Sequence, residues 1–121
     1  MSWDFNMVID IANGRDAEIF DGLNYTYNVS PMYVEAFNKE SEGSIALNIN
    51  KSKGIRILEG LTGEEAKPFL EKAIKKMKDE PNYYKTFNPK NGWGNYEGAL
   101  SLLEQLLEWA EYAPKAKFQI T

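Results

Sequence analysis

The chain reads Tyr96-Glu97-Gly98-Ala99-Leu100-Ser101-Leu102-Leu103-Glu104-Gln105-Leu106-Leu107-Glu108-Trp109-Ala110 near its end, and this stretch has the strongest periodic pattern in the sequence. Its apolar residues recur every three or four positions, which is the spacing of one helix face. Leu102 and Trp109 widen that face, and Pro114 ends the predicted helix. The face itself consists of Tyr96, Ala99, Leu100, Leu103, Leu106, Leu107 and Ala110.

A second amphipathic helix is predicted upstream of the first. Thr62 and Glu65 stand at the two positions of a capping box at its start, and Pro81 ends it. Because Pro68 removes one hydrogen bond inside the helix, we expect a first turn that is kinked or separate. The apolar stripe consists of Ala66, Phe69, Leu70, Ala73, Ile74 and Met77.

The N-terminal part of the chain alternates with a period of two instead. Residues 3–11 carry apolar side chains at the odd positions, which is the pattern of a half-buried strand. Asn13-Gly14 is a strong hairpin-turn signal, and Asp21-Gly22 predicts a bulge or break in the return strand. On one face of that return strand we expect Ile19, Leu23, Tyr25 and Tyr27.

Shorter elements are predicted in the middle and at the end of the chain. Ser30 is expected to be the N-cap of a short helix with Pro31 at its first position, and its inner face is Tyr33, Ala36 and Phe37. The remaining segments are expected to form a polar loop over 39–54 with a short strand at 44–49, a strand or helical turn over 55–61, and a terminal strand with Phe118 and Ile120 that closes the sheet.

These elements predict an α+β fold in which residues 1–121 form a single domain. A small antiparallel sheet, made of the N-terminal hairpin and short later strands, packs against one short helix and the two long helices of the C-terminal half. The sequence has no cysteine and no histidine, which excludes thiol chemistry and disulfides and removes the commonest general base. No cofactor and no metal site is predicted, and the net charge of −4 argues against direct nucleic-acid binding.

The sequence also predicts a cytoplasmic protein without a membrane segment. No apolar run approaches the roughly 20 residues that span a bilayer. The first ten residues carry two acids and no basic residue, which is unlike a signal peptide.

Residues 88–98, Asn88-Pro89-Lys90-Asn91-Gly92-Trp93-Gly94-Asn95-Tyr96-Glu97-Gly98, form the first candidate ligand site. Its glycines free the backbone to expose N–H groups, and the following helix N-terminus adds more of them, so the loop could hold a phosphate or carboxylate. The candidate residues are Asn91, Trp93, Asn95 and Tyr96, of which the two aromatic ones could stack on a base or sugar. The alternative is structural: Asn91-Gly92 is a turn, Asn95 caps the helix and Trp93 pins the loop onto the core.

A second cluster, Tyr25, Asn28 and Tyr33, could line the same pocket if the segments converge; Asn24, Tyr27 and Met32 lie among these residues. The alternative is an aromatic junction between strand and helix that packs on the core. The acids of the first hairpin, Asp10, Asp16, Glu18 and Asp21, single out no catalytic pair and leave a hydrolase as a third option.

Charge is segregated between the two long helices. The last helix carries Glu97, Glu104, Glu108 and Glu111 without any Lys or Arg, and the preceding helix carries Lys67, Lys72, Lys75, Lys76 and Lys78. Glu104, Glu108 and Glu111 are therefore candidate protein-contact residues, as an acidic surface that occupies a nucleic-acid-binding partner. The alternative is two solvated faces with ordinary pairing.

The segment from Asn88 to Leu100 resembles a stretch of small uncharacterised proteins from phages, prophages and bacterial genomes. They share Asn-Pro-x-Asn-Gly-Trp-Gly-x-Tyr-Glu-Gly before a leucine-rich helix. Weaker likenesses lie at residues 27–33 and 68–70, and residues 39–53 are longer here. The resemblance implies an accessory protein of phage or mobile-element origin, located in the host cytoplasm if a phage encodes it, and it assigns no catalytic residue.

Two functional hypotheses follow. The first is a non-enzymatic binding protein of phage or prophage type that counters a host defence by protein contact through the acidic helix. The second is a binder of a small nucleotide-like or anionic ligand that uses loop 88–98 with Tyr25, Asn28 and Tyr33. The widened apolar face of the last helix also allows a homodimer.

Overall fold

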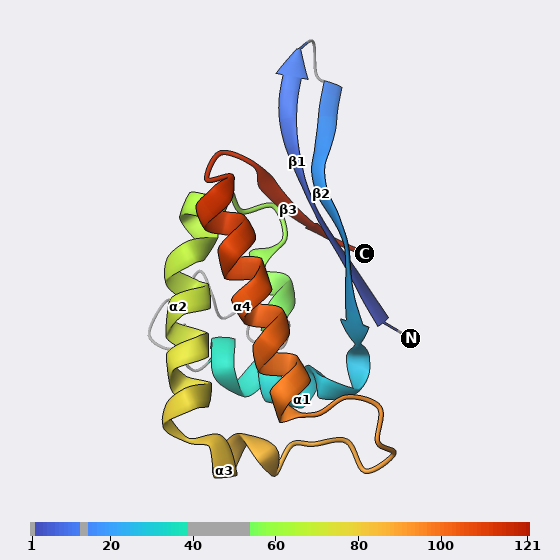
Figure 1. The fold of residues 1–121 in the computed structure, drawn as a ribbon, viewed down its shortest axis with the longest axis vertical. Coiled ribbons are helices and arrows are strands. Elements are labelled where there is room, and N and C mark those ends of the chain that lie inside the picture. Colours follow the sequence, from blue (N-terminus) through green and yellow to red (C-terminus); the bar gives the residue numbers. More distant parts are fainter. Residues whose placement is uncertain (1, 13–14, 39–53) are drawn as a thin grey trace.

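The computed structural model describes residues 2–12, 15–38 and 54–121 and has the predicted α+β fold (Figure 1). Its sheet is antiparallel with the strand order β2-β1-β3. The strands and α-helices are β1 (Ser2–Ala12), β2 (Arg15–Thr26), α1 (Ser30–Tyr33), α2 (Gly63–Asp79), α3 (Pro81–Lys85), α4 (Tyr96–Tyr112) and β3 (Lys117–Ile120). The Asn13-Gly14 turn and the expected strand at 44–49 lie outside the described residues.

The β1–β2 hairpin contains the bulge predicted at Asp21-Gly22. Phe5 pairs with Leu23 and Met7 pairs with Phe20, so β2 has one residue more than β1 between these two pairs. Gly22 lies there with φ +90°, a conformation that suits glycine because it has no Cβ.

The bulge also changes which residues of β2 face the core. Cross-strand partners lie on the same face of a sheet, so Phe20 joins Leu23 and Tyr25 on the core side. Ile19 is exposed instead. The prediction that Ile19 shares a face with Leu23 and Tyr25 is therefore wrong, because the extra residue reverses the alternation.

Helical turns surround α1. A 3-10 turn, Tyr27–Val29, leads directly into it, so the cap position falls on Val29 and the predicted N-cap at Ser30 is wrong. A turn of π-helix, Val34–Asn38, continues α1 and buries Ala36 and Phe37 as predicted. A 3-10 helix, Gly54–Leu58, precedes α2, which settles residues 55–61 in favour of the helical alternative.

The start of α2 has the predicted capping box. The Thr62 hydroxyl accepts a hydrogen bond from the Glu65 N–H at 3.2 Å, and the Glu65 carboxylate accepts one from the Thr62 N–H at 2.9 Å. The bond from the Thr62 N–H, together with one that the Thr62 hydroxyl donates to the same carboxylate at 3.2 Å, lowers the pKa of Glu65. α2 continues through Pro68 as a single helix, so its first turn is not separate. Pro81 ends α2 and also opens α3, an element that was not predicted.

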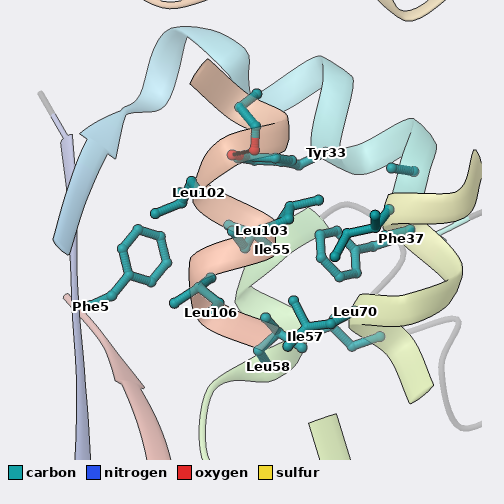
Figure 2. Packing of buried hydrophobic residues seen from close by; sticks show 14 of the residues in the cluster. Phe5, Tyr33, Phe37, Ile55, Ile57, Leu58, Leu70, Leu102, Leu103 and Leu106 are labelled. Atoms are coloured by element: carbon teal, nitrogen blue, oxygen red, sulfur yellow. Dashed lines mark hydrogen bonds between the residues drawn. The ribbon is translucent and has the colours of Figure 1, made fainter. Parts of the chain in front are cut away.

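The core lies between the sheet and the helices. Figure 1 shows α2 and α4 side by side, with the sheet on the other side of α4. In Figure 2, Leu102 of α4 points toward Phe5 of β1, while Leu103 and Leu106 lie near the 3-10 helix residues Ile55 and Leu58. Because α4 has neighbours on both sides, Leu102, which widens its apolar face, packs against the sheet of the same chain.

Close contacts join the C-terminal part of the chain to β1 and α2. β3 pairs with β1 from Phe5–Ile120 to Val8–Lys117, which confirms the predicted terminal strand. A Cβ at Gly63 would lie 2.7 Å from the Ala110 carbonyl oxygen, so α2 begins in contact with the α4 backbone. No helix in the described part of the chain is both long and apolar enough to cross a membrane.

Candidate functional site

Loop 88–98 lies beside the end of β2, so the structure brings two of the predicted clusters together (Figure 1). Tyr25 of β2 makes the link. Its hydroxyl accepts a hydrogen bond from the Asn95 N–H at 3.0 Å and lies 3.4 Å from the Asn95 carbonyl oxygen, to which it donates. Both hydrogen-bonding roles of the Tyr25 hydroxyl are thus used to hold the loop.

Two glycines of the loop permit this close approach. A Cβ at Gly98 would overlap the Tyr25 hydroxyl, and a Cβ at Gly94 would lie 2.7 Å from Thr26 Cγ2 and 2.9 Å from Val29 Cγ1. Gly94 also has φ +96°, which disfavours other residues. The glycine spacing therefore serves packing against the end of β2.

Three asparagine side chains of the loop accept hydrogen bonds from the loop's own backbone. Asn91 accepts from the Trp93 N–H at 3.0 Å, Asn95 from the Gly98 N–H at 2.7 Å, and Asn88 from the Tyr96 N–H at 2.8 Å. The predicted turn at Asn91-Gly92 and the predicted cap at Asn95 are confirmed. Together with the Asn95 N–H, from which Tyr25 accepts, these donors are already occupied and are not available to an anion.

A hollow of about 600 Å³, here called the Trp93 hollow, opens between the loop and the end of β2. No charged residue of the described chain lines it; its lining is Ser2, Asn24, Tyr25, Thr26, Asn28, Asn91, Trp93 and Gly94. The Trp93 side chain is 69% exposed. The interpretation that Trp93 pins the loop onto the core is therefore wrong, although the rest of the loop is held in place.

Two of the predicted ligand residues, Tyr33 and Tyr96, lie in the core and do not line the Trp93 hollow. The Tyr33 hydroxyl donates to the Ala99 carbonyl at 2.8 Å and the Tyr96 hydroxyl to the Met77 carbonyl at 2.6 Å. Burial raises the pKa of both, with repulsion from Tyr25 adding to the rise at Tyr33 and repulsion from Glu97 at Tyr96. Both are neutral donors that brace α4.

Ser2 and Thr26 line the Trp93 hollow and were not among the predicted residues. They are cross-strand partners in the hairpin, next to the pair of Trp3 and Tyr25. Counting the cross-strand pairs of the hairpin outward from its turn could have placed Ser2 and Thr26 opposite each other. Each register shift in the hairpin changes this count, however, and the shifts were not all predicted.

The predicted acidic surface of α4 is largely paired. Lysines of α2 and α3 contact three of its four glutamates: Lys67 contacts Glu111 at 3.4 Å, Lys78 contacts Glu104 at 2.9 Å, and Lys85 contacts Glu97 at 3.7 Å. These contacts match the alternative of ordinary pairing between solvated faces. Glu108 lies elsewhere, beside a hollow that is also lined by Gln105.

Three aromatic side chains line the same hollow as Glu108. The Phe20 ring stacks on Trp109 with 5.1 Å between centroids, and Tyr112 meets Phe20 edge-on at 5.8 Å. Tyr112 is 82% exposed. We call Phe20, Trp109 and Tyr112 the aromatic surface. Trp109 is half-buried, because Phe20 of β2 covers part of it. Trp109 is one of the two residues whose widening of the apolar face allowed a homodimer.

The structure describes two of the four acids of the hairpin, Glu18 and Asp21. Glu18 accepts a hydrogen bond from the Asn6 side chain at 2.8 Å. The side chains of Asp10 and Asp16 lie outside the described residues. Among the described residues, no three acids lie close enough to hold a metal ion.

The comparisons with known proteins add no family to this geometry. No protein-family model matches the chain, and neither a curated protein nor a solved structure matches it.

Proposed function

We propose that this chain is a non-enzymatic binding protein that takes a small, uncharged polar ligand into the Trp93 hollow. The observation that carries the proposal is an indole that is 69% exposed on a loop whose backbone is fixed by its own asparagines and by Tyr25. A large aromatic ring in water on a rigid support loses little conformational entropy when a ligand covers it.

The polar groups of the hollow support the same function. Among the described residues, the side-chain amides of Asn24 and Asn28 have no protein partner, and both residues are exposed. Each amide offers one acceptor and two donor hydrogens. A few free polar groups around an aromatic wall are typical of small-molecule sites.

The chemistry of the lining favours a neutral ligand over the nucleotide-like or anionic one suggested by the sequence. An anion would need cationic side chains or free N–H groups. The hollow has no Lys or Arg in its described lining, and three N–H groups at the start of α4, those of Asn95, Tyr96 and Gly98, are already bound by Tyr25, Asn88 and Asn95.

Indole NMR tests this proposal directly, because the chain has only three tryptophans. We expect fractions of a bacterial small-molecule extract to shift the ¹⁵N-indole resonance of Trp93 and to leave that of the buried Trp3 in place. Trp93→Ala should abolish the mass adduct of the same fraction in native mass spectrometry, while Tyr112→Ala should keep it. An extract that leaves the Trp93 resonance unmoved in every fraction contradicts the proposal.

A second candidate function, contact with a protein partner, is favoured by the aromatic surface. Aromatic residues are enriched at protein interfaces, and the exposed Tyr112 lies on α4 beside a hollow that Glu108 also lines. Such contact would fit the first hypothesis, an accessory protein of phage or prophage type that counters a host defence by protein contact. A partner bound by wild type and by Trp93→Ala, but lost in the double variant Tyr112→Ala/Glu108→Lys, would support it; equal binding by all three would not.

A further inference from the structure

We infer that the ligand of the Trp93 hollow is a saccharide, with the C–H face of one pyranose ring on the Trp93 indole and its hydroxyls on the surrounding amides. The inference rests on the proposed function of this hollow. It follows from three properties of the lining: the mixture of donors and acceptors, the number of aromatic faces, and the absence of charge from the described lining residues.

The hydrogen-bonding groups of the hollow match hydroxyls. Within the described part of the chain, Asn24 and Asn28 each present a free carbonyl oxygen and a free NH₂ group, whereas the carbonyl of Asn91 accepts from the Trp93 N–H. A hydroxyl donates and accepts at once, so it satisfies both ends of such an amide. A phosphate or carboxylate only accepts, and it would leave the two free carbonyl oxygens unmatched.

The aromatic part of the hollow consists of one accessible face. Trp93 is exposed, but the Tyr25 ring is half-buried, and the Tyr25 hydroxyl both donates a hydrogen bond to the Asn95 backbone and accepts one from it. A pyranose ring has one face of C–H groups that carry small positive charges, and these are attracted to the negative face of an indole. A single exposed face therefore suits a sugar ring, whose hydroxyls extend sideways to the asparagines.

A nucleoside is the main competitor, because a base also stacks and also offers donors and acceptors. Bases bind most tightly when they are enclosed by stacking groups and when their phosphates meet cations. The described lining supplies neither a second exposed ring nor a positive side chain. The open hollow predicts weak binding of a single sugar ring, with a Kd on the order of 1 mM.

The test is a titration of the ¹⁵N-tryptophan-labelled full chain with two sets of probes. The saccharides are methyl β-D-glucopyranoside, cellobiose, maltose and N,N′-diacetylchitobiose; the competitors are adenosine, uridine and AMP. We expect at least one saccharide to shift the Trp93 indole resonance and not that of Trp3, with saturation transfer strongest for the protons of one ring face. Raising the salt concentration from about 0.05 to about 0.5 M should leave the Kd unchanged, because neither side is charged.

Variants separate stacking from hydrogen bonding. Trp93→Ala should weaken binding at least about tenfold, Trp93→Phe less, and Asn28→Ala about three- to tenfold, as expected for one hydrogen-bonding side chain. Tyr112→Ala is the matched control, an exposed aromatic residue outside the hollow, and should bind as wild type does. Because these residues are exposed, the substitutions should leave the fold intact, and circular dichroism of each variant checks this.

Four outcomes decide between the proposals. If an uncharged nucleoside shifts Trp93 and no saccharide does, the saccharide inference is overturned while the proposed function stands. If the bacterial extract shifts Trp93 but every saccharide fails, the result is the same. If AMP alone shifts Trp93, the ligand is an anion and the proposed function is overturned as well. If neither extract nor probe moves Trp93, both the inference and the proposed function are overturned.

Discussion

Loop 88–98 and the glutamate stripe of α4 follow one another in the chain, yet their neighbours have opposite effects on them. Beside the loop, Asn24 of β2 and Asn28 of the following 3-10 turn add uncharged polar groups, and the asparagines of the loop hold its backbone while the Trp93 side chain stays exposed. Along α4, the neighbour α2 places lysines on Glu104 and Glu111.

The difference teaches that a candidate site is defined by what the adjacent element contributes. The glutamates are the more conspicuous feature in the sequence, but exposed pairing reduces the charge that they offer to a partner. The asparagines are less conspicuous, and three of them are used to hold the loop. At both places, a ligand or a partner can use only those side chains that the described part of the chain leaves unpaired.

The largest effect that we expect concerns the contact between α2 and α4. Gly63→Ala should lower the free energy of unfolding by about 3 kcal/mol, because the new Cβ meets only backbone atoms, at 2.7 Å from the Ala110 oxygen and 2.8 Å from the Ala113 oxygen. Urea denaturation measures this change. If backbone contact rather than ion pairing fixes the α2–α4 face, this variant should be far more harmful than loss of a charge.

Gly60→Ala is the matched control for that prediction. Gly60 has an unusual backbone, with φ +83°, but a Cβ added there would have no atom within 4 Å, so the expected cost is only the backbone strain of about 1 kcal/mol. Gly63 lies in α2 without a positive φ, so its expected cost comes from the close approach to α4, and equal losses in the two variants would contradict this account.

The next effect concerns the Trp93 hollow. Gly98→Ala should lower the free energy of unfolding by about 1–2 kcal/mol and displace Tyr25, because its Cβ would overlap the Tyr25 hydroxyl. The Trp93 indole resonance should therefore move even without ligand. In Gly92→Ala, where no atom lies within 4 Å, the hydrogen bonds of Tyr25 to Asn95 should persist. An unchanged indole spectrum in Gly98→Ala would contradict the role of this glycine in holding the two segments together.

A smaller effect distinguishes the two buried tyrosines that brace α4. Tyr96→Phe should cost about 1–2 kcal/mol, because the Met77 carbonyl lies in the last turn of α2 and then loses its donor. Tyr33→Phe should cost less, about 0.5–1 kcal/mol, since the Ala99 carbonyl lies inside α4 and keeps its helical partner. Thermal denaturation of both variants measures the difference, and the reverse order would disprove this account.

The long elements could be predicted because their signals are local. The capping box of Thr62 with Glu65 and the cap at Asn95 are fixed by residues three positions apart, and the apolar stripes of both long helices follow from spacing alone. The bulge at Gly22 was also visible as a turn dipeptide. Its consequence, the exposure of Ile19, was not predicted, because it depends on how many residues the bulge adds.

The candidate site could be predicted only in part. The sequence named Tyr25, Asn28, Asn91 and Trp93, which do line one hollow. It also named Asn95, which caps α4 and does not line the hollow, and Tyr33 and Tyr96, which are buried. Nothing in the composition of an aromatic cluster indicates which ring will find a buried carbonyl. Tyr33 and Tyr96 reach carbonyls of α4 and α2, and these contacts join residues far apart in the chain.

The smallest effect that we expect is at the ion pair of Lys78 with Glu104. A double-mutant cycle with Lys78→Met and Glu104→Gln should give a coupling energy of about 0.2–1 kcal/mol, because both side chains are about half exposed, at 54% and 47%, although their charged atoms lie 2.9 Å apart. Salt at about 1 M should remove most of that coupling. A coupling above about 2 kcal/mol that resists salt would mean that the pair is desolvated. The glutamate stripe would then be a structural element of the α2–α4 contact, and the contrast with the Trp93 hollow would be sharper still, since its charge would be unavailable to any partner.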